Sequence, residues 1–138
     1  MTSIKIDEFG SFSFWLIEDK ILAIRLLENG EKALLDVPTA RYALAVQRDL
    51  CEKKKEKILV LANLSNMSRI SAEARAWAKS PEGLEVNTYI SAYALVAPNL
   101  FGRMLASIIM RIYRPSYAAK LFPNEKMAID WLLTYKNN

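Results

Sequence analysis

Apolar residues recur along the chain in two patterns, one typical of strands and one typical of helices. Short apolar or aromatic runs bounded by turn residues predict strands at 12–18, 21–27, 32–35, 57–62, 89–97 and 118–122. Apolar residues at helical spacing predict four helices, at 36–55, 71–79, 99–113 and 123–135. Two stretches show neither pattern: 63–70 is predicted to be a polar loop, and Ser80–Gly83 a helix break.

The order of these elements predicts an α/β fold in one domain spanning residues 1–138. Three strands come first, and helices and strands then alternate to the end of the chain. Such alternation is typical of βαβ units, whose strands are parallel. We therefore expect a mixed, mostly parallel sheet of about five to six strands, with an N-terminal antiparallel hairpin and four helices.

Composition excludes several classes of function. The formal net charge is only +4, and the densest basic cluster, 53–55, is flanked by Glu52 and Glu56, so we expect no nucleic-acid partner. The chain contains no histidine and one cysteine, Cys51, which removes histidine-based nucleophile systems and the usual metal sites. We therefore expect no catalytic residues, no metal and no cofactor.

The lone cysteine and the N-terminal sequence also bear on location. One thiol cannot form an intrachain disulfide, and the acidic residues Asp7 and Glu8 argue against a secretory signal. No apolar run reaches the roughly 18 residues that an integral membrane helix needs. These observations predict a cytoplasmic protein.

Four stretches resemble a known group of proteins. They are Ile70-Ser71-Ala72-Glu73-Ala74-Arg75, the strand Ala92-Tyr93-Ala94-Leu95-Val96, the arginine-containing helix that follows it, and the C-terminal segment Leu121-Phe122-Pro123-Asn124-Glu125-Lys126-Met127-Ala128-Ile129-Asp130-Trp131-Leu132. With the order of elements, they resemble the STAS fold of bacterial anti-sigma-factor antagonists. The likeness is greater to a STAS-like group related by fold to the phosphatidylinositol-transfer (CRAL-TRIO) lipid-binding proteins. It covers roughly 12–133 and implies a STAS-like domain.

The resemblance also implies a candidate phosphorylation site. In STAS antagonists a serine or threonine at the start of the second helix is phosphorylated, and the added charge releases the partner. The matching stretch here is 66–71, where Ser71 lies nearest to that position and Ser68 is the second candidate. The stretch lacks the Asp-Ser pair and the glycine of the antagonist motif. The sequence favours a simpler role for Ser71, as the N-cap of a helix.

The segment 99–113 is the strongest candidate for a functional surface. Its apolar residues cover more than one stripe of a helix, whereas a helix packed on a sheet usually keeps its outer side polar. Such a helix is either buried deeply inside the domain or contacts a second chain or an apolar ligand. The candidate interface residues are Leu100, Phe101, Met104, Leu105, Ile108 and Ile112.

Four arginines are candidates for contact with an anion. Arg103 and Arg111 align on one helix face with Ser107 between them, and Arg114 follows directly after the helix. Arg75 lies four residues after Ser71. Aligned arginines are suited to an acidic partner or phospholipid head groups, although the sequence favours the simpler interpretation of a solvated helix face.

These observations favour a non-enzymatic interaction module that acts through residues 99–113 and self-associates, with a homodimer or an unidentified protein as partner. One alternative is a carrier of a small apolar ligand or lipid, as the resemblance to lipid-binding proteins suggests. Another is a phosphorylation-controlled antagonist that uses Ser71 or Ser68.

Overall fold

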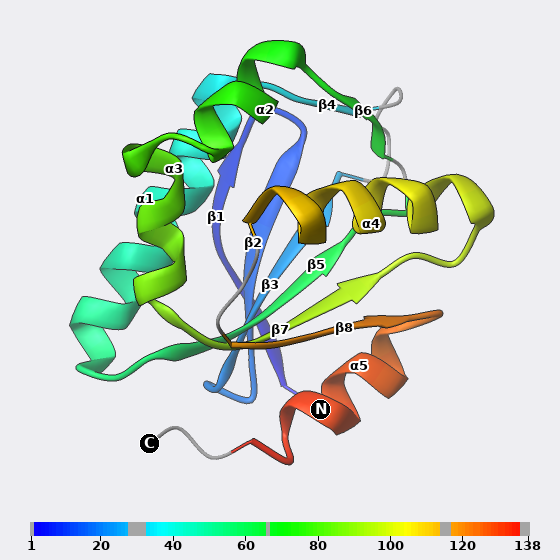
Figure 1. The fold of residues 1–138 in the computed structure, drawn as a ribbon. Coiled ribbons are helices and arrows are strands. Elements are labelled where there is room, and N and C mark those ends of the chain that lie inside the picture. Colours follow the sequence, from blue (N-terminus) through cyan, green and yellow to red (C-terminus); the bar gives the residue numbers. More distant parts are fainter. Residues whose placement is uncertain (1, 28–32, 66, 114–116, 136–138) are drawn as a thin grey trace.

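The fold is built on a six-stranded sheet with strand order β1-β2-β3-β5-β7-β8 (Figure 1). The computed structural model describes residues 2–27, 33–65, 67–113 and 117–135. The strands are β1 (Ser3–Phe9), β2 (Phe12–Ile17), β3 (Ile21–Leu26), β5 (Ile58–Asn63), β7 (Ile90–Val96) and β8 (Ala118–Phe122). Strands β1, β2 and β3 pair antiparallel, whereas β3, β5, β7 and β8 pair parallel. The predicted mixed α/β sheet is therefore confirmed.

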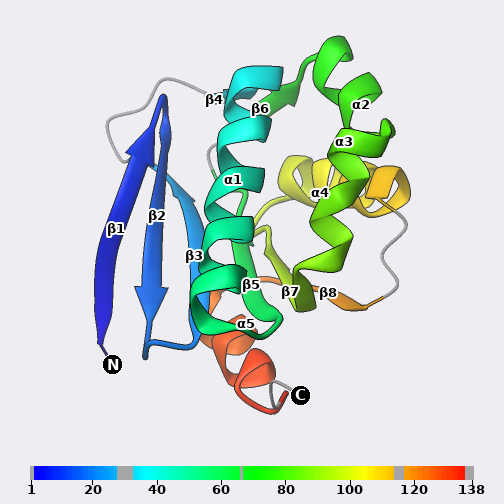
Figure 2. The same ribbon diagram turned by 90° about the vertical axis from the view of Figure 1, so that its left-hand side faces the viewer.

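Helices cover the two faces of this sheet unequally. One face is covered by α1 (Val37–Lys54), α2 (Ala72–Ala78), the 3-10 helix η1 (Glu85–Thr88) and α4 (Leu100–Tyr113), and the other by α5 (Glu125–Leu132). Figure 1 shows α4 and α5 on opposite sides of β7 and β8. In Figure 2, α1 lies between the β1–β2 hairpin and the segment containing α2 and α3 (Pro81–Leu84).

Capping side chains fix where the helices begin. The Asp36 carboxylate accepts a hydrogen bond from the Thr39 amide at 3.0 Å, and the Ser71 hydroxyl accepts one from the Ala74 amide at 3.0 Å. The side chain of Asn124 does the same for α5. Each bond satisfies an amide that the helix itself leaves free. The predicted starts of α1 and α2 are thus confirmed, whereas α5 begins at Glu125, two residues after the predicted start.

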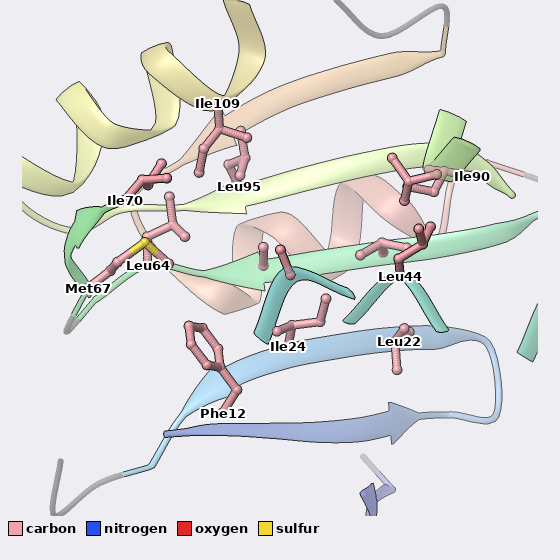
Figure 3. Close-up of a cluster of buried hydrophobic side chains, with 14 of the residues drawn as sticks. Phe12, Leu22, Ile24, Leu44, Leu64, Met67, Ile70, Ile90, Leu95 and Ile109 are labelled. Carbon is pink, nitrogen blue, oxygen red and sulfur yellow. The ribbon is translucent and has the colours of Figure 1, made fainter. Parts of the chain in front are cut away.

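Alternating side chains of the central strands divide the core into two clusters. On β5, Ile58 and Val60 face the side of α1 and α4, whereas Leu59 and Leu61 face α5. Figure 3 shows the larger cluster, in which Ile109 of α4 lies close to Leu95 of β7. Burial on both faces explains the continuous apolar run of this strand.

Three parts of the sequence-based prediction are wrong. Residues 3–9, left unassigned, form the edge strand β1. The stretch 63–70 is not entirely loop, since β6 (Met67–Ile70) pairs parallel with β4 (Ala33–Leu35) in a separate two-stranded sheet. The break at 80–83 contains α3, so the described residues form five α-helices, not four. Each missed element is short or exposed, and β6 in addition depends on pairing with a distant segment.

Candidate functional site

The outer side of α4 combines exposed apolar and basic side chains. Leu100 is 74% exposed and Met104 57% exposed, which is high for large apolar residues. Arg103, Ser107 and Arg111 are exposed on the same helix. We call these five residues the α4 surface. Their spacing of three and four residues places them along one side of the helix.

The inner side of α4 packs within its own domain. Leu105, Ala106 and Ile109 are buried, and Ile108 is half-buried against the core. Leu105 is therefore unavailable to a partner in this fold. The side chains of Phe101 and Ile112 lie outside the described part of the structure. Internal packing accounts for part of the broad apolar pattern, and among the described side chains of α4 it leaves Leu100 and Met104 strongly exposed.

The charge of the α4 surface is uncompensated within the described chain. None of the ion pairs among described residues includes Arg103 or Arg111. Arg75 is exposed on α2, a helix that packs against α4, and Arg114 lies outside the described residues. Two guanidinium groups without an ionic partner among the described residues, next to exposed apolar side chains, favour a partner that carries carboxylates or phosphates.

Ser71, the candidate phosphorylation site, already has a structural role. Its hydroxyl caps α2 by accepting the Ala74 amide, and the residue is half-buried. This geometry agrees with the N-cap interpretation. The side chain of Ser68 lies outside the described part of the structure.

A polar cluster that the sequence analysis missed lies at the carboxyl ends of β3 and β5. The Glu125 carboxylate accepts hydrogen bonds from Arg25 Nε at 2.9 Å, Arg25 Nη2 at 2.7 Å and Asn63 Nδ2 at 2.8 Å. The Arg25 guanidinium also lies 5.3 Å from the ring centroid of Trp15, within cation–π range. Burial alone would raise the pKa of Glu125, but the bonds from Arg25 and Asn63 outweigh it and lower that pKa.

This cluster borders a hollow of about 600 Å³. Ligands of open parallel sheets often bind at this edge. Here, however, Arg25, Asn63 and Glu125 are bonded to one another, and Asn63 Oδ1 also accepts the Ser65 amide at 3.0 Å. The arrangement therefore fixes α5 to β3 and β5.

The described residues offer little chemistry for catalysis or metal binding. They contain no group of three or more histidine, cysteine, aspartate or glutamate side chains placed to hold a metal ion. Burial, with a smaller effect of nearby Glu52, raises the pKa of the Cys51 thiol and so disfavours its reactive thiolate. Among the helices that the structure describes, none has the length and apolar character required to cross a membrane.

The fold and its comparisons define the class of this chain as an α/β domain with a SpoIIAA-like, STAS-like fold. It is similar to an uncharacterized protein from the DUF3478 family of Shewanella loihica PV-4, which has a SpoIIAA-like fold, with a TM-score of 0.63. The two sequences are 14% identical, and the match covers 96% of each chain. The predicted resemblance to STAS-like proteins is thus confirmed at the level of fold.

The chain belongs to the family described as "Domain of unknown function (DUF7793)", which matches residues 14–136. No curated protein matches the chain.

Proposed function

We propose that this chain is a non-enzymatic, cytoplasmic interaction module that binds an acidic protein segment through the α4 surface. The observation that carries the proposal is the pairing of exposed Leu100 and Met104 with Arg103 and Arg111, which have no ionic partner among the described residues. An amphipathic segment with carboxylates beside its apolar side chains would bury the first pair and neutralise the second.

The positions of the arginines bear on the identity of the partner. Arg103 and Arg111 lie four residues on either side of Ser107. If two copies paired through antiparallel α4 helices centred on Ser107, Arg103 of one copy would face Arg111 of the other. Like charges would then meet at an interface with only two strongly exposed apolar residues per copy. We therefore favour a different, acidic protein over the homodimer that the sequence suggested.

The test is a quantitative pull-down from native cell extract, with matched variants on the two faces of the sheet. Met104→Ser and Arg111→Glu change the α4 surface. Met127→Ser and Lys126→Glu make comparable changes on α5, where Met127 is 49% exposed and Lys126 is exposed. We expect each α4 variant to reduce recovery of the protein captured by the wild type at least about tenfold, which corresponds to about 1.4 kcal/mol of binding free energy. The α5 variants should leave that recovery unchanged.

Two further measurements separate the alternatives. Recovery should fall as salt is raised, because ionic contacts at an exposed surface are screened. Light scattering after size exclusion should give the mass of a monomer for the isolated chain. A wild-type dimer that Met104→Ser converts to monomers would replace the proposal with self-association. Equal recovery by all four variants would refute a role for α4 altogether.

A further inference from the structure

A cavity of about 100 Å³ lies between the sheet and the helices on the face that α1 and α4 cover. Its walls come from distant parts of the chain, including Phe12 of β2, Ile24 of β3, Leu44 of α1 and Ile109 of α4. Figure 3 shows these four side chains grouped around the same region of the core. Most of the lining is apolar, so the space suits an apolar molecule better than water.

One polar side chain in this lining has an unused hydrogen-bonding atom. Gln47 is 5% exposed and lies on the inner side of α1, between the buried residues Leu44 and Leu50. Its Nε2 donates to the Ala43 carbonyl at 3.0 Å, whereas its Oε1 is buried without a partner in the described part of the structure. A buried acceptor without a donor is unfavourable, and an apolar residue here would avoid that cost.

Two other polar residues of the lining, Thr39 and Asn63, are bonded to other parts of the chain. The amide and the side chain of Thr39 both bond to Asp36. The side chain of Asn63 donates to Glu125 and accepts from Ser65. Among the described residues, Gln47 Oε1 is therefore a buried acceptor without a partner on a residue that lines the cavity, and Trp77 Nε1 is a buried donor without one in the same lining. A hydroxyl group, which both donates and accepts, suits such a lining.

We propose that this cavity binds a small, neutral, mainly apolar molecule that donates one hydrogen bond to Gln47 Oε1. An alcohol or phenol supplies that donor, whereas an ionised carboxylate or phosphate does not. Apolar cavities of roughly 150 Å³ accommodate a benzene-sized ring, so a space of about 100 Å³ accepts a ring after small adjustments of its walls. It is too small for a whole lipid, so the occupant differs from the lipid that the sequence-level resemblance suggested.

The test compares phenol and toluene, which have similar shapes but differ in the hydrogen-bond donor. Binding is followed by the methyl NMR signals of Leu44, Leu64 and Ile109, which line the cavity. Signals of Leu59 and Leu61, which face α5 in the other core cluster, serve as controls. We expect both probes to shift the first group and not the second, with phenol binding more tightly.

The decisive variant is Gln47→Leu, which removes the acceptor and keeps a side chain of similar volume. Because it replaces an unsatisfied buried amide with an apolar group, we expect it to fold, as thermal unfolding would verify. Phenol affinity should fall about tenfold or more, and toluene affinity should stay the same or rise. Absence of shifts with either probe, or equal phenol affinity in both proteins, would overturn the proposal. Neither result would affect the α4 surface, which is tested with other residues.

Discussion

The ion pair between Arg25 and Glu125 should contribute more to stability than its exposed counterpart in the same chain. Arg25 and Glu125 form two parallel hydrogen bonds, of 2.9 and 2.7 Å, and their side chains are 26% and 25% exposed. Arg41 and Glu82 form the same two-bond geometry, at 2.9 and 3.0 Å, with 56% and 47% exposure. The two pairs thus share their chemistry and differ in solvent contact.

The magnitude follows from this difference in exposure. A hydrogen bond to a charged group contributes roughly 1.5–3 kcal/mol when well shielded, and less when water competes for both partners. Because the Arg25–Glu125 pair is mostly but not fully buried, we expect a coupling energy of about 2 kcal/mol. Water can replace both partners of the Arg41–Glu82 pair, so its coupling should be clearly smaller.

The assay is a double-mutant cycle for each pair, measured by urea unfolding. One cycle uses Arg25→Ala and Glu125→Ala, and the other uses Arg41→Ala and Glu82→Ala. Each cycle isolates the interaction between the two side chains from the other effects of truncation. Equal coupling in the two cycles, or weaker coupling at Arg25–Glu125, would refute the reasoning that burial decides the contribution of these pairs.

Three further predictions concern single positions. Because the folded-state pKa of Glu125 is lowered, the ionised carboxylate stabilises the fold above the unfolded pKa of about 4.3, and this stabilisation is lost as pH falls through the folded pKa. In urea unfolding, the stability of Glu125→Gln should therefore approach that of the wild type below about pH 4. A difference in stability that stays constant with pH would contradict this. Gly83→Ala would place a methyl group 2.2 Å from the Trp77 carbonyl oxygen, so we expect the free energy of unfolding to fall by about 2 kcal/mol or more. The fall should be smaller for Gly102→Ala, where the nearest atom is 3.1 Å away. Equal melting temperatures for these two variants would contradict that. Ser71→Ala should cost about 1 kcal/mol in urea unfolding and Ser71→Asp almost nothing, because aspartate also caps helices. Loss of partner binding in Ser71→Asp alone would instead favour control by phosphorylation.

Elements with a strong local pattern could be predicted from the sequence, and those defined by distant pairing could not. The run 57–62 contains β5, because burial on both faces requires apolar residues throughout. Strand β1 was missed because it lies at a sheet edge, where Ile4 and Ile6 are 59% and 43% exposed among charged neighbours. Strand β4 was predicted at 32–35, but its four-residue partner β6 was not, because the two pair across more than thirty residues of sequence.

The candidate sites likewise divide into features that a local pattern predicts and features that depend on contacts between distant residues. The helix at 99–113 was located correctly, but only packing decides that Leu105 faces inward while Met104 faces outward. Arg25 and Glu125 are 100 residues apart, so no local spacing connects them. A usable signal did exist for Gln47, since a polar residue three positions from Leu44 and Leu50 interrupts the inner side of α1.

The unequal covering of the two sheet faces affects how the chain is proteolysed or aggregates. On the α5 side, a single helix of eight residues shields Leu59, Leu61 and Val96. If α5 detaches, the central strands that it covers become exposed together, whereas several helices cover the opposite face. Resistance to proteases and to aggregation should therefore depend more on how tightly α5 is held than on the global free energy of unfolding.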